Sequence, residues 1–175
     1  MSSTDAVIDF YNGGKDSDGR TLEAILAWSD EQLEAVHDFI QWVFPSRRPS
    51  NVNPFAPLVT DETVRAFDRD PALRAQLRHA LERMLRFYGL RSRDGRVEID
   101  ERAFAARSRV WLAPGNHNHL RLTRIMDSLS TLGLRTEALA LQHCLIEDVC
   151  RGAGEGRVAP RTIEFWSRAV SAGTE

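Results

Sequence analysis

The chain has 175 residues, of which 42% are hydrophobic, so it is the size of one ordinary domain and can bury a substantial core. Its formal net charge of −2 offers no global positive field, which argues against nucleic acid or an anionic membrane as main partner. No segment approaches the roughly 20 apolar residues of a transmembrane segment, and the first residues lack the pattern of a signal peptide. Cys144 and Cys150 are six residues apart, which suits neither a zinc pair nor an obvious disulfide. We therefore expect a soluble, cytoplasmic protein with reduced thiols.

The first part of the chain predicts helices after a loosely ordered start. Residues 1–19 are expected to be loosely ordered, with a candidate strand at 7–11, and a helix is predicted for 20–28. A second helix should begin at Ser29, where Ser29 and Gln32 match a capping box, and continue to Phe44 before a proline stops it. Apolar residues on more than one side of this helix predict that it is central and enclosed.

A proline-rich segment separates this helix from the next ones. Residues 45–60 contain four prolines and predict a long surface loop, a kind of segment that is often functional. Thr60 should cap a short helix, and Asp70 with Pro71 should start a longer one that ends at Gly89 in a left-handed conformation. The predicted core face of the longer helix is formed by Leu73, Leu77, Ala80, Leu81, Met84, Leu85 and Tyr88.

Helices also dominate the remaining sequence. The Asp94-Gly95 turn and the alternation after it predict at most one small hairpin near 91–100. Asp100 should cap a further helix, and others are predicted at 117–133, at 137–151 and from Pro160. The sequence thus predicts an all-α fold over residues 1–175, a single compact domain of about seven or eight helices.

The stretch 117–133 carries the most informative pattern, a polar row beside an apolar face on one helix. Helical spacing aligns His117, Arg121, Arg124 and Ser128 along the edge of that face. Apolar neighbours should enclose both arginines in part, and an enclosed guanidinium needs a negatively charged partner.

A second set of polar residues suggests a shared site. His37 and Gln41 are one turn apart at the border of the predicted central helix. We expect them to face His117, Asn118, Arg121 and Arg124 in a semi-buried seam. A peptide carboxylate or another small anion would suit the two arginines.

Other interpretations of these residues stay open. The arginines could pair with internal carboxylates, for which the candidates are Glu34, Asp38, Glu147 and Asp148. His37 could be a core-edge histidine with one satisfied hydrogen bond. Alternatively, His37 or His117 could be the general base of an uncharacterised enzyme.

Three other motifs are weaker. The NGGKDS stretch at 12–17 differs in one letter from the SGGKDS loop of ATP pyrophosphatases, but that fold needs a parallel sheet for which the chain supplies almost no strands. His117 and His119 are two apart and should point to different sides, which disfavours a metal site. Acidic residues within 137–151 disfavour a DNA-binding helix pair. We expect no metal, no cofactor and no nucleic-acid partner, and the oligomeric state is not predictable.

Three segments together resemble the conserved region of the opioid growth factor receptor family, in the same order and at similar spacing. They read HDFIQWVFP at 37–45, MLRFYGL at 84–90 and HNHLRLTRI at 117–125. The proline-rich segment and residues 139–170 resemble the family more loosely. The resemblance therefore covers most of the chain from about Phe10, and the chain looks like a short homologue that lacks the animal C-terminal tail.

This resemblance implies an all-helical domain without known catalytic residues. In animals the family's domain belongs to the receptor for the pentapeptide met-enkephalin, which restrains cell proliferation and is associated with the nucleus. The family's motif positions fall on His37, Gln41, Trp42, Pro45, Tyr88, Gly89, His117, Asn118, Arg121, Thr123 and Arg124. We therefore expect a non-enzymatic ligand-binding or regulatory domain that binds a peptide or small anion. The expected ligand-binding residues are His37, Gln41, Trp42, His117, Asn118, Arg121 and Arg124.

Overall fold

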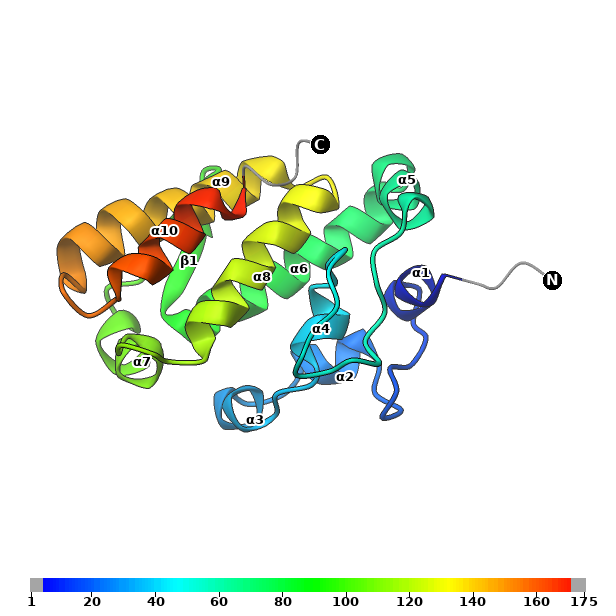
Figure 1. Cartoon of the computed structure of the whole chain (residues 1–175), viewed down its shortest axis with the longest axis horizontal. Coiled ribbons are helices and arrows are strands. Elements are labelled where there is room, and N and C mark those ends of the chain that lie inside the picture. Colours follow the sequence, from blue (N-terminus) through cyan, green and yellow to red (C-terminus); the bar gives the residue numbers. More distant parts are fainter. Residues whose placement is uncertain (1–4, 171–175) are drawn as a thin grey trace. The chain divides into compact units, whose positions relative to one another are not determined.

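The computed structural model describes residues 5–170, most of which are helical (Figure 1). This part of the chain forms ten α-helices, one π-helix and a two-stranded antiparallel sheet. The predicted fold class, all-α with seven or eight helices, is therefore wrong. The chain divides into two compact units, residues 1–80 (unit 1) and residues 81–175 (unit 2). Among the described residues, no helix has the length and apolar character that crossing a membrane requires.

Unit 1 contains five short helices and the first part of a long one. The short helices are α1 (Ala6–Tyr11), α2 (Leu22–Leu26), α3 (Asp30–Ala35), α4 (Ile40–Val43) and α5 (Asp61–Arg69). The long helix α6 (Pro71–Tyr88) continues into unit 2. Thr60 caps α5 as predicted, because its hydroxyl accepts the backbone N–H of Thr63.

The strand expected at 7–11 is wrong, because α1 occupies these residues. The carboxylate of Asp5 starts the helix by accepting the backbone N–H groups of Val7 and Ile8. Tyr11 then anchors α1 in unit 1: its ring lies 5.1 Å from that of Phe67, and its hydroxyl donates to the carbonyl of Val43 at 2.5 Å. Burial raises the pKa of Tyr11. Of the segment expected to be loosely ordered, residues 1–4 lie outside the described residues.

The helix predicted from Ser29 to Phe44 is in fact two helices, α3 and α4. The predicted capping box of Ser29 and Gln32 is confirmed at its start. However, α3 ends at Ala35, and the next residue, Val36, is extended with a φ of −93° and a ψ of 127°. Asp38 is held outside a helix by two longer-range hydrogen bonds, because its carboxylate accepts from Arg20 at 3.0 Å and its carbonyl accepts from Asn53 at 3.1 Å. Because apolar residues continue at helical spacing across this break, the sequence pattern did not indicate it.

Helix α6 has the predicted core face. All seven residues of that face are buried, and the helix ends before Gly89, whose φ of 75° is the predicted left-handed stop. A side chain could not replace this glycine without moving its neighbours, because an added Cβ would lie 2.7 Å from the Cα of Phe104.

Unit 2 contains the sheet and the remaining helices. These elements are β1 (Leu90–Arg93), β2 (Arg96–Ile99), α7 (Phe104–Trp111), α8 (Asn118–Thr131), α9 (Arg135–His143), the π-helix η1 (Cys144–Ala153) and α10 (Pro160–Ala169). Helix α8 packs against both α9 and α10, and η1 packs against α9, α10 and β2 (Figure 1). Trp111 and Trp166 are fully buried in this unit.

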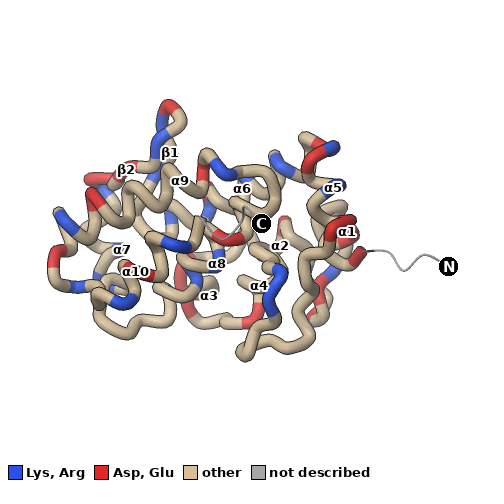
Figure 2. The backbone as a smooth tube through the Cα atoms, turned by 45° about the horizontal axis from the view of Figure 1, so that its top comes forward, with Lys and Arg blue, Asp and Glu red and all other residues tan. Residues whose placement is uncertain are grey.

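The two strands pair from Leu90 opposite Ile99 to Arg93 opposite Arg96. Asp94 and Gly95 connect them with positive φ angles of 50° and 74°, as a tight hairpin turn of right-handed twist requires. The hairpin carries both basic and acidic residues (Figure 2), and one cross-strand pair joins Arg91 to Glu98 at 2.7 Å.

Two helix boundaries of unit 2 differ from the predictions. The helix expected at 137–151 is α9 followed by η1, in which Gly152 has non-helical φ and ψ of −120° and −108°. Helix α7 begins later than predicted, because the carboxylate of Asp100 accepts the backbone N–H of Arg102 in a separate turn. The backbone thus departs from a regular helix at Gly152 in one case and at the hydrogen-bonded turn of Asp100 in the other, although the apolar pattern is continuous.

Candidate functional site

The first turn of α8 is positioned by a tight turn and by Asn116. Gly115, with a φ of 74°, reverses the chain after α7. The side chain of Asn116 then donates to the carbonyl of Val110 and accepts the backbone N–H of Asn118, both at 2.9 Å. These two bonds connect the start of α8 to the end of α7. They fix the direction in which the polar residues of α8 project.

Four polar side chains meet at Asn118 in unit 2. Asn118 is fully buried and its Oδ1 accepts from Arg121 Nη1 at 3.3 Å and from the hydroxyl of Tyr88 at 3.5 Å. Its Nδ2 lies 3.4 Å from Nε2 of His117. Arg121 is only 5% exposed, so its guanidinium belongs to the interior of the protein. The structure thus brings together His117, Asn118 and Arg121, and adds Tyr88.

Arg124 lies one turn further along α8 and is half-buried. Loss of hydration lowers the pKa of its guanidinium, while the negative charge of Asp127 opposes this shift. Asp127 was missed as a partner, although its i, i+3 spacing from Arg124 could have indicated it. Two of the carboxylates proposed as partners of Arg121 and Arg124 form ion pairs with other arginines. Asp38 contacts Arg20 at 3.0 Å, and Glu147 contacts Arg151 at 2.7 Å.

The three other predicted site residues belong to unit 1. Gln41 and Trp42 are buried on the short helix α4. His37 is exposed in the segment between α3 and α4, so the prediction that it shares a helix with Gln41 is wrong. Gln41 Nε2 donates to the hydroxyl of Ser50 in the proline-rich segment at 3.5 Å. Its Oε1 and the indole N–H of Trp42 are buried without a hydrogen-bond partner among the described residues.

His119 is the buried histidine of α8. It is 3% exposed, and its Nε2 lies 3.0 Å from the carbonyl of Trp111. The rings of Trp111 and Trp166 approach its ring edge to face. Burial lowers the pKa of His119; the bond to Trp111 acts in the opposite direction, and the neighbouring His117 adds to the lowering. His117, two residues earlier in the chain, is exposed.

The glycine-rich stretch at 12–17 does not have the surroundings of a nucleotide loop. It follows the helix α1, and its interior is occupied by Asp16, whose carboxylate accepts from the backbone of Asp18 and Arg20 and from Arg20 Nε at 2.7 Å. A negatively charged side chain at this point repels phosphate. Within residues 5–170, no group of three or more potential metal ligands comes together.

Both cysteines are buried free thiols of η1. Burial raises the pKa of Cys144 to about 12, with Asp148 acting in the same direction. Burial also raises the pKa of Cys150 to about 11. Since the thiolate is the reactive form, neither residue is suited to be a nucleophile.

Comparison with known proteins identifies a family. The family model described as the opioid growth factor receptor (OGFr) conserved region matches residues 4–175. The opioid growth factor receptor of Mus musculus is 38% identical over 134 residues, which are 74% of this chain and 21% of the mouse protein. The receptor of Homo sapiens is 36% identical over 139 residues, covering 74% of this chain and 20% of the human protein.

A second group of relatives is also similar. Opioid growth factor receptor-like protein 1 of Mus musculus is 33% identical over 125 residues, which are 66% of this chain and 25% of that protein. The matched regions thus span between 20% and 25% of the length of these curated relatives. No solved structure matches the chain.

Proposed function

This chain belongs to the family of the opioid growth factor receptor conserved region, and we propose that it is a non-enzymatic, receptor-like domain that binds a peptide carboxylate or another small anion at α8. The names of its relatives describe receptors of a growth factor, which is a ligand-binding role. The binding residues that we propose in unit 2 are His117, Asn118, Arg121 and Arg124.

The observation that carries this proposal is the buried Arg121 and its contact with Asn118. A buried guanidinium is stable only where negative charge or oxygen acceptors are close to it. Arg121 also lies in the first turn of α8, where the positive end of the helix dipole disfavours a cation. A negatively charged ligand group at this point would therefore interact favourably with both the guanidinium of Arg121 and the positive end of the α8 dipole.

Arg124 supports the same ligand chemistry. Its guanidinium follows Arg121 by three residues, so both project from the same side of α8. A guanidinium binds a carboxylate through two parallel hydrogen bonds, and such bonds are stronger in partly dehydrated surroundings. Arg124 is half-buried, so its guanidinium lies in such surroundings. Its replacement should also destabilise the fold less than replacement of the more buried Arg121.

Calorimetric titration with met-enkephalin, which has a free carboxyl terminus, tests the proposal. The Arg124→Gln variant should bind about tenfold more weakly than the unmodified chain, because it loses a charge-assisted pair. Arg124→Lys, which keeps the charge and loses the planar fork, should fall between the two.

Arg109→Gln is the matched control, because Arg109 is an exposed arginine of the neighbouring helix α7. Circular dichroism should show that all variants keep their helices. Equal affinity of Arg124→Gln and Arg109→Gln would contradict the assignment of the site to α8.

A further inference from the structure

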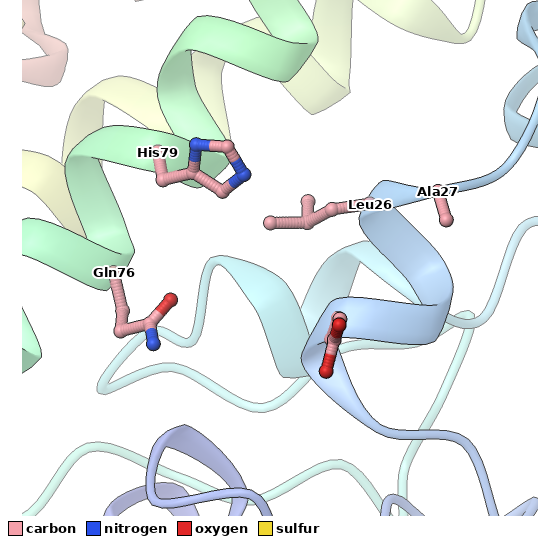
Figure 3. A pocket seen from close by; sticks show the side chains of 5 residues that line it. Leu26, Ala27, Gln76 and His79 are labelled. Atoms are coloured by element: carbon pink, nitrogen blue, oxygen red, sulfur yellow. The ribbon is translucent and has the colours of Figure 1, made fainter.

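A cleft in unit 1 lies between α2 and α6, and none of its lining residues belongs to α8. It has a volume of about 370 Å³. Glu23 and Leu26 of α2 line it together with Ala27, which directly follows α2, and Gln76 and His79 line it from α6. Spacings of three and four residues place each set on one face of its helix. Figure 3 shows Leu26 and His79 pointing toward each other, with Gln76 one turn along α6.

Three side chains of this cleft can accept hydrogen bonds. These are the Glu23 carboxylate, the Gln76 amide oxygen and a ring nitrogen of neutral His79. None of the three side chains makes a hydrogen bond or ion pair with another residue of the described range 5–170. All three are exposed, so a ligand can reach them without a change of fold. Half-buried Leu26 and exposed Ala27 add apolar surface beside them.

This set of groups matches one ligand chemistry. A primary ammonium carries three N–H donors and a positive charge, which three acceptors including one carboxylate can satisfy. An apolar group next to the ammonium would contact Leu26 and Ala27. We infer that the α2–α6 cleft binds a primary ammonium attached to an apolar group, from either a small amine or a peptide amino terminus.

The volume is consistent with such a ligand, because small-molecule sites in proteins usually enclose about 300–1,000 Å³. The charge of the ligand is opposite to that proposed for α8. The two proposals therefore rest on different residues and need different probes, and either can fail without the other.

Titration of the isotope-labelled protein with phenethylamine, followed by NMR, tests the inference. Backbone amide signals of residues 23–27 and 76–79 should shift. The neutral analogue 2-phenylethanol should leave them almost unchanged, because it lacks the charge that Glu23 recognises. Glu23→Gln should weaken phenethylamine binding by about tenfold.

Glu62→Gln is the matched control, because Glu62 is an exposed glutamate at the second position of α5, as Glu23 is in α2. It should bind phenethylamine as the unmodified chain does. The inference is overturned if phenethylamine shifts no signal of the cleft, or if Glu23→Gln and the unmodified chain bind it equally.

A second arm distinguishes the two sources of the ammonium. Two carboxyl-amidated pentapeptides are compared, one with a free and one with an acetylated amino terminus, so that neither has a terminal carboxylate for α8. Shifts in the cleft with the free amino terminus alone identify a peptide as the source. Shifts with phenethylamine but with neither peptide identify a small amine.

Discussion

His119 lies between two indole rings and makes one hydrogen bond through its ring, to the carbonyl of Trp111. Because a carbonyl can only accept, Nε2 carries the proton and Nδ1 is the unprotonated nitrogen. Nδ1 is buried and has no hydrogen-bond partner among the described residues. Adding a proton there would place a positive charge in the core without a partner. The folded protein therefore favours neutral His119.

This lowered pKa predicts how stability depends on pH. At pH values below the ordinary histidine pKa, the unfolded chain takes up a proton that the folded protein resists, so acid favours unfolding. His119 makes its full contribution to stability above its pKa in the unfolded chain, which is about 6.5. This contribution is lost as the pH falls from there through the lower pKa that His119 has in the folded protein. Urea titrations at pH 7.5 and pH 5 should show a smaller pH dependence for His119→Gln than for the unmodified chain.

His143→Gln serves as the control, because His143 is exposed. It should retain the pH dependence of the unmodified chain. If His119→Gln and His143→Gln lost stability in acid to the same extent, His119 would not be the group responsible.

At the scale of individual residues, the sequence predicted which polar residues lie on α8 but not which residues they contact. The spacing of His117, Arg121 and Arg124 could be read because a helix fixes which residues share a side. Tyr88 comes from another helix, and its contact with Asn118 depends on tertiary packing. Local periodicity contains no information about such a contact.

At the scale of secondary structure, the turn after α6 depends on a glycine for two reasons. Gly89 has a positive φ, and an added Cβ would also collide with the backbone of Phe104. Gly95 has nearly the same φ, 74°, but nothing lies within 4 Å of an added Cβ. Comparing substitutions at Gly89 and Gly95 therefore separates the effect of backbone strain from the effect of steric collision.

We expect Gly95→Ala to lower the free energy of unfolding by about 1 kcal/mol, from backbone strain alone. Gly89→Ala should lower it by about 3 kcal/mol or more, because backbone must also move. Urea denaturation followed by circular dichroism measures both changes. Similar values for the two variants would mean that the chain at Gly89 relaxes around the added methyl group.

Element boundaries were predicted best where a local signal exists. Pro160 at the start of α10 and Gly89 after α6 restrict the backbone directly. The break between α3 and α4 had no such signal, because Asp38 is held by Arg20 and Asn53, which lie elsewhere in the sequence. The π-helix η1 was likewise not predictable, since its apolar residues suit an ordinary helix.

At the scale of the whole molecule, α6 links the two units through a single continuous helix. Leu77 belongs to unit 1 and Met84 to unit 2, and both are buried on the same face of α6. Unfolding of α6 would therefore remove core residues from both units. The predicted single domain should unfold in one cooperative transition.

Fluorine NMR of 5-fluorotryptophan-labelled protein can follow both units in one urea titration. Trp28 and Trp42 report on unit 1, and Trp111 and Trp166 report on unit 2. We expect all four signals to change at the same urea concentration. Two separate midpoints would show instead that each unit unfolds by itself.

The central claim is that α8 binds an anionic group of a ligand. The most direct measurement compares the affinity of the unmodified chain for met-enkephalin with a free carboxyl terminus and for the same peptide with an amidated terminus. Removing the carboxylate should weaken binding by about tenfold or more, since each good charge-assisted pair contributes at least about 1.4 kcal/mol. The amide signals of Asn118 to Arg124 should shift with the free acid. Equal affinity for the two peptides, or no binding of either, would contradict the claim.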